Sequence, residues 1–289
     1  KDKTGKLQRV KPARGEALTG LEGGWKHPLT IRMEGIVPTV YPHEIIDWNE
    51  QHVGEVDKLP GIHSEEQFAA WLKVYNRNVD KWEAMNVADS VELAHYGVHN
   101  DGETPGTDGW TFYLWNDIDC KDMKPDANGA FVKALTEGVT FDGKGYVLHN
   151  LMLDFEHTAP SSGRVGLIGE IRGGRLRNLH LDFVTVRNMD VDTPSGCIAG
   201  RISSGQIFDC TVREAKMMCR GGVAGVLAGE MSGGDMAGCK FHGMVQAKEM
   251  QDETEWGYKK IVNGVVGRMP SDFKGTVAND IINRVFITD

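Results

Sequence analysis

Polar side chains recur at fixed positions in the second half of the chain, and three of them could bind or cleave a sugar polymer. Asp182, Arg213 and His242 each stand thirteen residues after a glycine. Their carboxylate, guanidinium and imidazole groups can bind sugar hydroxyls, but glycoside hydrolysis needs a pair of carboxylates and this column has one. The column therefore predicts a shallow glycan-binding strip, or a solvated face of alternating charge. The flanking polar positions are His180, Thr211 and Lys240.

Aromatic side chains in loops are a second place where a sugar could bind, because sugar rings stack on Trp and Tyr. Trp256 and Tyr258 lie in an acidic insertion, residues 251–258, which is expected to project as a loop. Trp110 and Trp115 qualify less, since they fall in a strand pattern that would bury them. We therefore include Trp256 and Tyr258 among the expected ligand-binding residues.

Enzyme signatures are otherwise missing from the sequence. His43 and Glu44 begin a segment one residue short of the H-E-x-x-H of zinc proteases, but the segment follows Pro42 and has a strand pattern. Residues 221–225 match neither a dinucleotide fingerprint nor a phosphate loop. No serine stands in the G-x-S-x-G frame of a nucleophile elbow. We expect no catalytic residue, no metal and no cofactor.

The elements that must position these residues are repeats of about 30 residues. Residues 150–155 return 28 residues later, at 178–183, with a single difference. Three glycine pairs share one internal spacing and lie 31 and then 29 residues apart: Gly169 with Gly174, Gly200 with Gly205, and Gly229 with Gly234. A period of this length indicates stacked structural units.

Aligning the repeats on the first glycine of each pair gives alternating apolar and polar columns. The apolar columns lie two residues before the glycine and two, seven, ten and twelve residues after it; the tenth holds Leu179, Cys210 and Cys239. Alternation with period two and no helix between the repeats favours short parallel strands, each coil lying on the last. The glycines are expected at the corners, where φ is positive. The alternatives are a β-sandwich and a flexible glycine-rich linker.

Composition fits a folded, soluble and exported protein. Of 289 residues, 40% are hydrophobic and 25% are charged, and no apolar stretch approaches a membrane span. The net charge of −9 argues against binding nucleic acid, which needs a basic surface. Cys210 and Cys239 share a column, so they are either buried thiols or a disulfide. The start at Lys1, without Met, favours a processed or truncated form.

Three parts are expected along the chain. Residues 1–57 form a short β segment with strands at 29–33 and 44–48, residues 58–109 a linker and capping-helix region, and residues 110–289 the parallel β-helix. The helix begins at Ser64, which makes a capping box with Gln67. Its apolar face consists of Phe68, Trp71, Leu72 and Tyr75. We expect it to cover the open first coil, since solenoids need caps; the alternative is a helix packed elsewhere in the core.

Two sets of residues resemble known families. Residues 63–270 are similar to bacterial surface proteins that carry the GLUG repeat, and the segments behind this resemblance are 68–72, 112–119, 141–147 and the Gly-rich unit 165–169. Residues 23–33 and 45–48 are similar to the last strands of fimbrillin-type pilin domains. The chain matches only these last strands of the family.

The resemblance implies a right-handed β-helix on the surface of a gut-dwelling Gram-negative bacterium. Such proteins are described as adhesins, which implies a secreted, non-enzymatic protein, extracellular or attached to the outer membrane. Its expected partners are host or microbial surface glycans or proteins, or other pilus subunits. A hypothesis of a different class, a β-helix polysaccharide lyase or glycoside hydrolase, rests on analogy of fold alone.

Overall fold

The computed structural model divides the chain into two compact units, Lys1–Leu59 and Pro60–Asp289. The residues it describes are 29–34, 37–42, 59–100, 109–155, 163–188, 190, 193–219, 223–246, 261–262, 265–271, 273–277 and 282–288. Trp256, Tyr258 and the segment that begins at His43 therefore lie outside the described residues.

The described part of the first unit is an antiparallel pair of strands. β1 (Leu29–Glu34) pairs with β2 (Val37–Pro42), with Arg32 opposite Thr39. The strand predicted at 29–33 is confirmed. β2 is not predicted from the sequence, because its two prolines, Pro38 and Pro42, are typical of turns. Proline is nevertheless tolerated in an edge strand, where its missing N–H leaves no ladder bond open. The strand expected at 44–48 lies outside the described residues.

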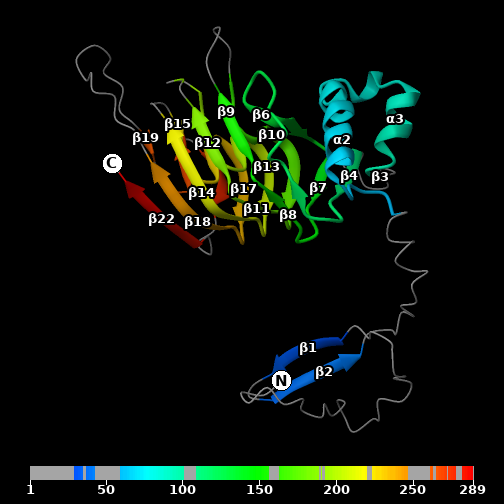
Figure 1. Cartoon of the computed structure of the whole chain (residues 1–289), viewed down its shortest axis with the longest axis horizontal. Helices are drawn as coiled ribbons and strands as arrows, with labels where there is room; N and C mark the ends of the chain where they lie inside the picture. The colour runs from blue at the N-terminus through cyan, green and yellow to red at the C-terminus, as the bar shows by residue number, and fades with distance from the viewer. Residues whose placement is uncertain are drawn as a thin grey trace. The chain divides into compact units, whose positions relative to one another are not determined.

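The second unit is a β-solenoid of mainly parallel strands, as predicted (Figure 1). Its first sheet runs in the order β20-β16-β13-β10-β7-β4-β3, with β6, β17 and β21 alongside, and its second in the order β22-β18-β14-β11-β8-β5, with β9 and β12 alongside. β3 and β4 pair antiparallel, whereas the other pairs in these sheets are parallel. The right-handed sense of coiling stays a prediction.

The strands are short because each coil contributes only a few residues to each sheet. The first sheet consists of β3 (Gly97–Asn100), β4 (Gly109–Tyr113), β6 (Ala130–Thr136), β7 (Thr140–Asp142), β10 (Gly166–Arg177), β13 (Ala199–Phe208), β16 (Ala228–Met231), β17 (Gly233–Ala237), β20 (Val266–Arg268) and β21 (Lys274–Val277). The second consists of β5 (Ile118–Asp119), β8 (Val147–His149), β9 (Met152–Phe155), β11 (His180–Asp182), β12 (Thr185–Asn188), β14 (Thr211–Cys219), β18 (Lys240–Gln246) and β22 (Ile282–Thr288). A small third sheet pairs β15 (Val223–Ala224) with β19 (Ile261–Val262).

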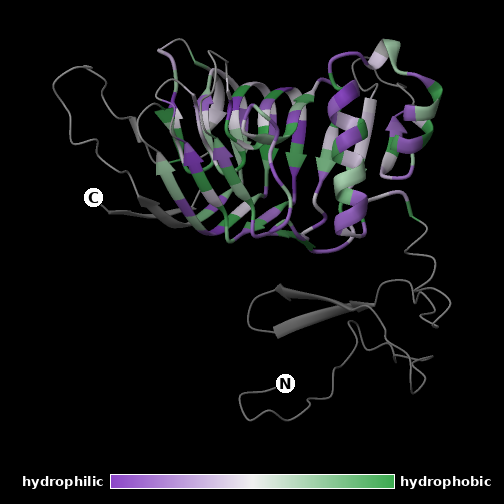
Figure 2. Cartoon of the chain, turned by 45° about the horizontal axis from the view of Figure 1, so that its top comes forward, coloured by the Kyte–Doolittle hydropathy of each residue, from purple (hydrophilic) through white to green (hydrophobic). Residues whose placement is uncertain are grey.

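The apolar columns predicted from the repeats form the core. Ile171, Ile202 and Met231 pair in register across β10, β13 and β16 and are fully buried. In the column ten residues after the glycine, the backbone bonds Thr211 N to Leu179 O and Lys240 N to Cys210 O hold successive coils in contact. Figure 2 shows hydrophobic and hydrophilic residues alternating along the strands. The expected stacking of equivalent side chains is thereby confirmed.

The sulfur atoms in this column stay reduced. Cys210 and Cys239 are buried and are not joined by a disulfide bond. Burial, followed by the neighbouring Cys239 thiol, raises the pKa of Cys210 well above its ordinary value. The thiols therefore act as apolar packing groups.

The expectation for the glycines is half right. Gly205 and Gly234 have the expected positive φ, at 97° and 87°, although they lie within β13 and β17; in the first repeat Gly173, within β10, has the positive φ in place of Gly174. Gly169, Gly200 and Gly229, predicted at corners, lie inside β10, β13 and β16. A side chain there would run into backbone, as at Gly229, where it would meet Ser195 and Pro194. Glycine is required at these three positions because neighbouring backbone atoms lie too close for a Cβ atom, and not because φ is positive.

The predicted helix is α2 (Glu65–Asn78), and it lies with α3 (Val87–Leu93) at one end of the strand stack (Figure 1). Ser64 Oγ accepts a hydrogen bond from Gln67 N, while Gln67 Oε1 accepts from His63 N, so the capping box closes one residue earlier than predicted. A 3₁₀ turn, η2 (Trp82–Ala84), joins the two helices.

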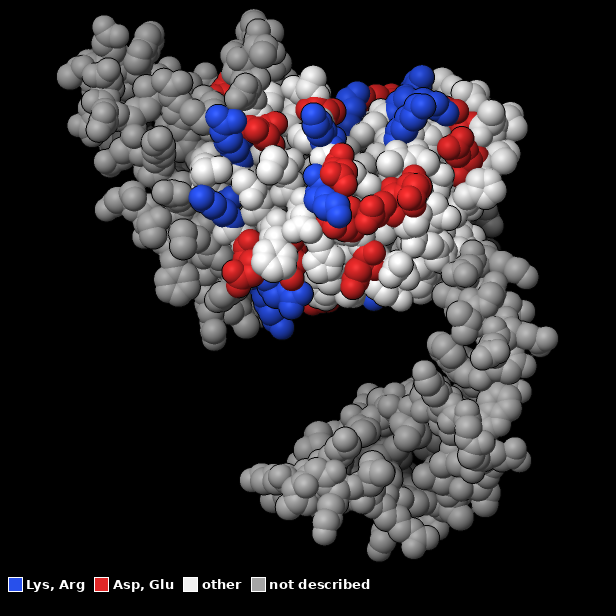
Figure 3. Space-filling view, in the orientation of Figure 1, with Lys and Arg blue, Asp and Glu red and all other residues white. Residues whose placement is uncertain are grey.

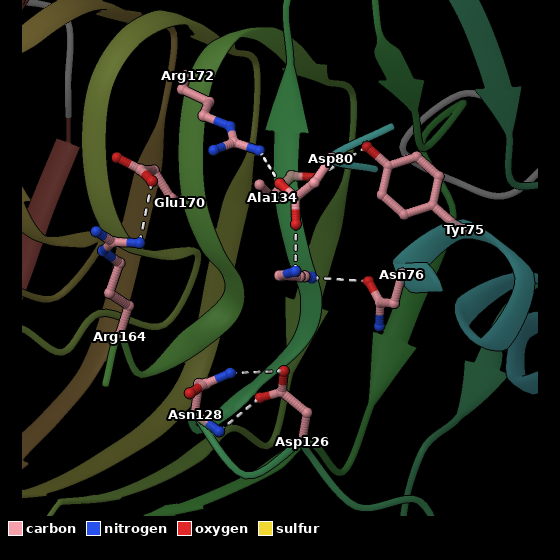
Figure 4. Close-up of polar contacts among 10 residues, drawn as sticks. Tyr75, Asn76, Asp80, Asp126, Asn128, Ala134, Arg164, Glu170 and Arg172 are labelled. Atoms are coloured by element: carbon pink, nitrogen blue, oxygen red, sulfur yellow. Dashed lines mark hydrogen bonds and ion pairs between the residues drawn. The ribbon is translucent and has the colours of Figure 1, made fainter. Parts of the chain in front are cut away.

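The inner face of α2 packs against the first coils. The Trp71 ring is fully buried, with its centroid 5.4 Å from that of Phe112 and 5.1 Å from that of Phe141. The Tyr75 hydroxyl donates to Ala134 O at 2.8 Å (Figure 4). Asn76 Nδ2 donates to Phe131 O at 2.7 Å. The helix thus supplies hydrogen bonds to backbone groups of β6 that have no strand beside them there.

Membrane-spanning helices are not found in the described part of the chain, because no helix there is both long and apolar enough to cross a bilayer.

Candidate functional site

A polar groove of about 460 Å³ runs along one corner of the solenoid, where each coil passes from the first sheet to the second. Four successive coils line it; the first contributes Asp142 and the turn after it, and each of the other three contributes a corner residue and the first residue of the next strand. The lining residues are Asp142, Lys144, Gly145, Asn178, His180, Asp209, Thr211, Gly238 and Lys240. The groove therefore crosses the strands instead of following one of them.

The sequence forms this corner with residues that tolerate a left-handed backbone. Asn178, Asp209 and Gly238 have φ of 53°, 52° and 64°, a region that Asn, Asp and Gly visit at least cost. The backbone ladder continues through the turn, because Asn178 N donates to Phe208 O at 3.1 Å. The corners therefore stack at the same spacing as the strands and line up their side chains.

Asp142 is an anchored anion at one end of the groove. Its carboxylate accepts from Lys144 N at 2.9 Å, Asn178 Nδ2 at 3.1 Å and Arg177 Nε at 3.0 Å. Burial alone would raise the pKa of Asp142, but the hydrogen bonds from Lys144 and Asn178 and the charge of Arg177 outweigh it and hold the pKa below its ordinary value. The group stays ionised and shapes the corner; it has no proton to give at neutral pH.

His180 lies in the groove as a neutral imidazole. Burial first, and then the nearby charges of Arg213 and Lys240, lower its pKa below 6.5, while Asp117 acts in the opposite direction. Its Nδ1 is shielded from solvent and has no hydrogen-bond partner among the described residues. His180 therefore contributes its ring to the lining of the groove, whereas this nitrogen is not exposed to a ligand.

Two aromatic rings stand next to the groove. The ring centroids of Tyr113 and Trp115 are 6.0 Å apart, and Lys144 Nζ lies 4.9 Å from the first and 5.4 Å from the second. Trp115 Nε1 donates to Pro60 O at 3.1 Å, which fixes the indole. Lys144 also lines the groove, so these rings lie beside its first coil without being part of the lining.

The column predicted from the sequence is adjacent to the groove but does not line it. Asp182, Arg213 and His242 pair in register across β11, β14 and β18. Arg213 forms an ion pair with Asp182 at 3.3 Å, so the one carboxylate of the column has a basic partner. The side chain of His242 lies outside the described residues. The flanking column of His180, Thr211 and Lys240 does line the groove.

Sequence reasoning missed a second polar column, which we call the charge ladder. It consists of Glu170, Arg201, Glu230 and Arg268, which pair in register across β10, β13, β16 and β20. Arg268 bonds Glu230 at 2.6 Å, and Arg201 lies 3.8 Å from the same carboxylate. The signal was present in the alignment, since each member directly follows a glycine.

A third polar cluster fastens α2 to the strands. Asp80, just beyond α2, accepts from both Lys133 on β6 and Arg172 on β10, and Arg164 bonds Glu170 at 3.0 Å nearby (Figure 4). The Lys133 ammonium, and then the Arg172 guanidinium, lower the pKa of Asp80. Elsewhere, Figure 3 shows acidic and basic side chains interspersed on the face it presents.

Comparison with protein-family models, curated proteins and solved structures finds no match to this chain. Within the described ranges no three His, Cys, Asp or Glu side chains lie together in a way that could hold a metal ion.

Proposed function

We propose that this protein is a non-enzymatic, ligand-binding solenoid of the cell surface, an adhesin or an accessory pilin-like protein. The observation that carries the proposal is the polar groove, which four coils line with repeated side chains. A stiff stack of coils presents such a groove in a fixed shape, so little conformational entropy of the protein is lost when a ligand binds.

The charges in the groove favour binding over catalysis. Asp142 is held by three hydrogen bonds and stays ionised. Asp209 is the other carboxylate of the lining, and it stands on a different coil. Glycoside hydrolysis needs one carboxyl that keeps its proton and a second that is ionised. A polysaccharide lyase or glycoside hydrolase remains the alternative proposal, and turnover assays distinguish the two.

The cellular setting rests on the sequence resemblance. The GLUG-type repeats and the fimbrillin-like segment support an extracellular or outer-membrane-attached location on a gut bacterium. Host or microbial surface glycans or proteins, or other pilus subunits, are then the partners, and no nucleic acid is among them, in line with the net charge of −9.

The experiment is to probe glycan and extracellular-matrix arrays with the purified chain, and to incubate the same preparation with acidic and neutral polysaccharides. We expect selective binding and no release of reducing or unsaturated ends. Turnover that disappears in His180→Ala would overturn the non-enzymatic assignment.

The loop aromatics give a second test. If Trp256 and Tyr258 contribute, the double Ala variant binds more weakly. Unchanged binding would leave recognition to the groove alone.

A further inference from the structure

We infer that the ligand of the groove is a linear, neutral glycan that lies along the solenoid axis, with about one sugar ring per coil. This inference rests on the proposed function and specifies the ligand for the same site. Direction, charge and hydrogen-bonding chemistry support it independently.

The direction of the groove favours a sugar polymer over a peptide. Its lining comes from successive coils, so the groove steps by about 4.8 Å from one coil to the next. An extended chain of pyranose rings advances by a similar length per ring. A peptide that adds to a sheet must run beside an edge strand, and within this groove the backbone groups of His180, Thr211 and Lys240 already pair with neighbouring coils.

The charge of the groove favours a neutral ligand. Lys144 and Lys240 balance Asp142 and Asp209, and the lowered pKa of His180 keeps it uncharged at neutral pH. An acidic polymer would meet two carboxylates in the groove and a net charge of −9 over the chain. A nucleic acid would in addition lack the basic surface that it needs.

The hydrogen-bonding groups match those of sugar hydroxyls, which both donate and accept. Thr211 does both, Asp209 accepts and Lys240 donates, and the ring of His180 adds to the same lining. At the far end, Tyr113 and Trp115 give a ring a surface on which to stack once the flexible Lys144 side chain moves aside.

The test measures calorimetric affinities for linear neutral oligosaccharides of the cello, manno, xylo and laminari series. Uronic-acid oligomers of the same lengths are compared with them. We expect affinity to rise with length and to level off near four rings, about one for each lining coil. We expect the acidic oligomers to bind at least about tenfold more weakly.

A matched pair of variants places the binding in the groove. Thr211→Tyr fills the groove, because Thr211 lies between His180 and Lys240 in register. Thr185→Tyr makes the same change at a half-buried position of β12 that does not line it. We expect loss of binding only in the first, with equal melting temperatures. If the first variant fails to fold, Thr211→Val tests the same hydroxyl without added bulk, and we expect weaker binding.

The outcomes separate the inference from the proposed function. Acidic oligomers or peptides that bind as well as neutral ones, and lose binding in Thr211→Tyr, would overturn the neutral glycan and leave the groove as the binding site. Neutral binding that Thr211→Tyr and Thr211→Val leave unchanged would overturn the inference. No binding to either oligosaccharide series or to the arrays would overturn both.

Discussion

The charge ladder and the groove are two polar columns of one solenoid, and they use their polar groups differently. In the ladder, Glu170 bonds Arg164 and Glu230 bonds Arg268, so both carboxylates have a basic partner on the protein. The groove is instead a hollow lined by polar side chains, among them Thr211 and Lys240. Each column also holds one shielded atom without a hydrogen-bond partner among the described residues, His180 Nδ1 in the groove and Arg201 Nε in the ladder.

This difference shows how a repeat separates support from recognition. Opposite charges on neighbouring strands of the ladder form ion pairs that stabilise the stack. A ligand could therefore form few additional ion pairs with them. Polar groups that line a hollow at the stacked corners can instead form hydrogen bonds with a bound ligand. The following predictions compare the two columns.

The largest expected effect comes from glycine. Gly229→Ala, in the strand of the ladder, would push a methyl group into the backbone at Ser195 and Pro194, so we expect a loss of about 3 kcal/mol in the free energy of unfolding. Gly145→Ala, in the groove, would meet no atom within 4 Å, and its positive φ should cost about 1 kcal/mol. Denaturant unfolding measures both, and equal losses would contradict the close-approach explanation.

Removing one charge from each column should separate stability from binding. Glu230→Gln breaks the contacts with Arg268 and Arg201, so we expect a loss of about 1 kcal/mol in stability and unchanged ligand affinity. Lys240→Gln, in the exposed wall of the groove, should leave stability unchanged and weaken binding severalfold. Parallel calorimetry and thermal unfolding test the pair; weaker binding in Glu230→Gln would contradict the division.

The smallest effect is a dependence on pH. Burial and the charges of Arg213 and Lys240 outweigh Asp117 and lower the pKa of His180 below 6.5. The unfolded chain therefore binds the proton first, and stability falls as the pH drops from about 6.5 to the folded-state pKa of His180.

The variant His180→Gln should not show this loss of stability. The loss of stability due to carboxylates such as Asp142 begins at lower pH and should still occur in the variant. Unfolding measured every half unit from about pH 7 to about pH 2 checks both steps. A stability that rises on acidification through the first window would contradict the lowered pKa.

The core could be predicted from the sequence, but the groove could not. Spacing from the repeat glycines placed Ile171, Ile202 and Met231 in one column because buried strands leave a strong period-two pattern. The same alignment marked His180, Thr211 and Lys240 as polar. It could not show that they lie in a hollow, since that depends on how far the corner at Lys144 and Asn178 turns.

The remaining errors have similar physical causes. Gly169 was placed at a corner because positive φ and close approach both demand glycine, and a sequence does not distinguish them. The charge ladder was missed because alternating signs resemble an ordinary solvated surface. The strand pattern predicts that Trp110 and Trp115 are buried, and Trp110 is, yet Trp115 is only half-buried and lies beside Lys144.

The most direct test of the central claim compares the two columns in one titration. Nitrogen-15 spectra would follow the imidazole ring of His180 in the groove and the Arg268 guanidinium of the ladder as a neutral oligosaccharide of about four rings is added, one per lining coil. Signals would be assigned with His180→Gln and Arg268→Lys. We predict a saturable shift of His180, whose ring lines the occupied groove, and no shift of Arg268. A shift of Arg268 with His180 unmoved would contradict the account.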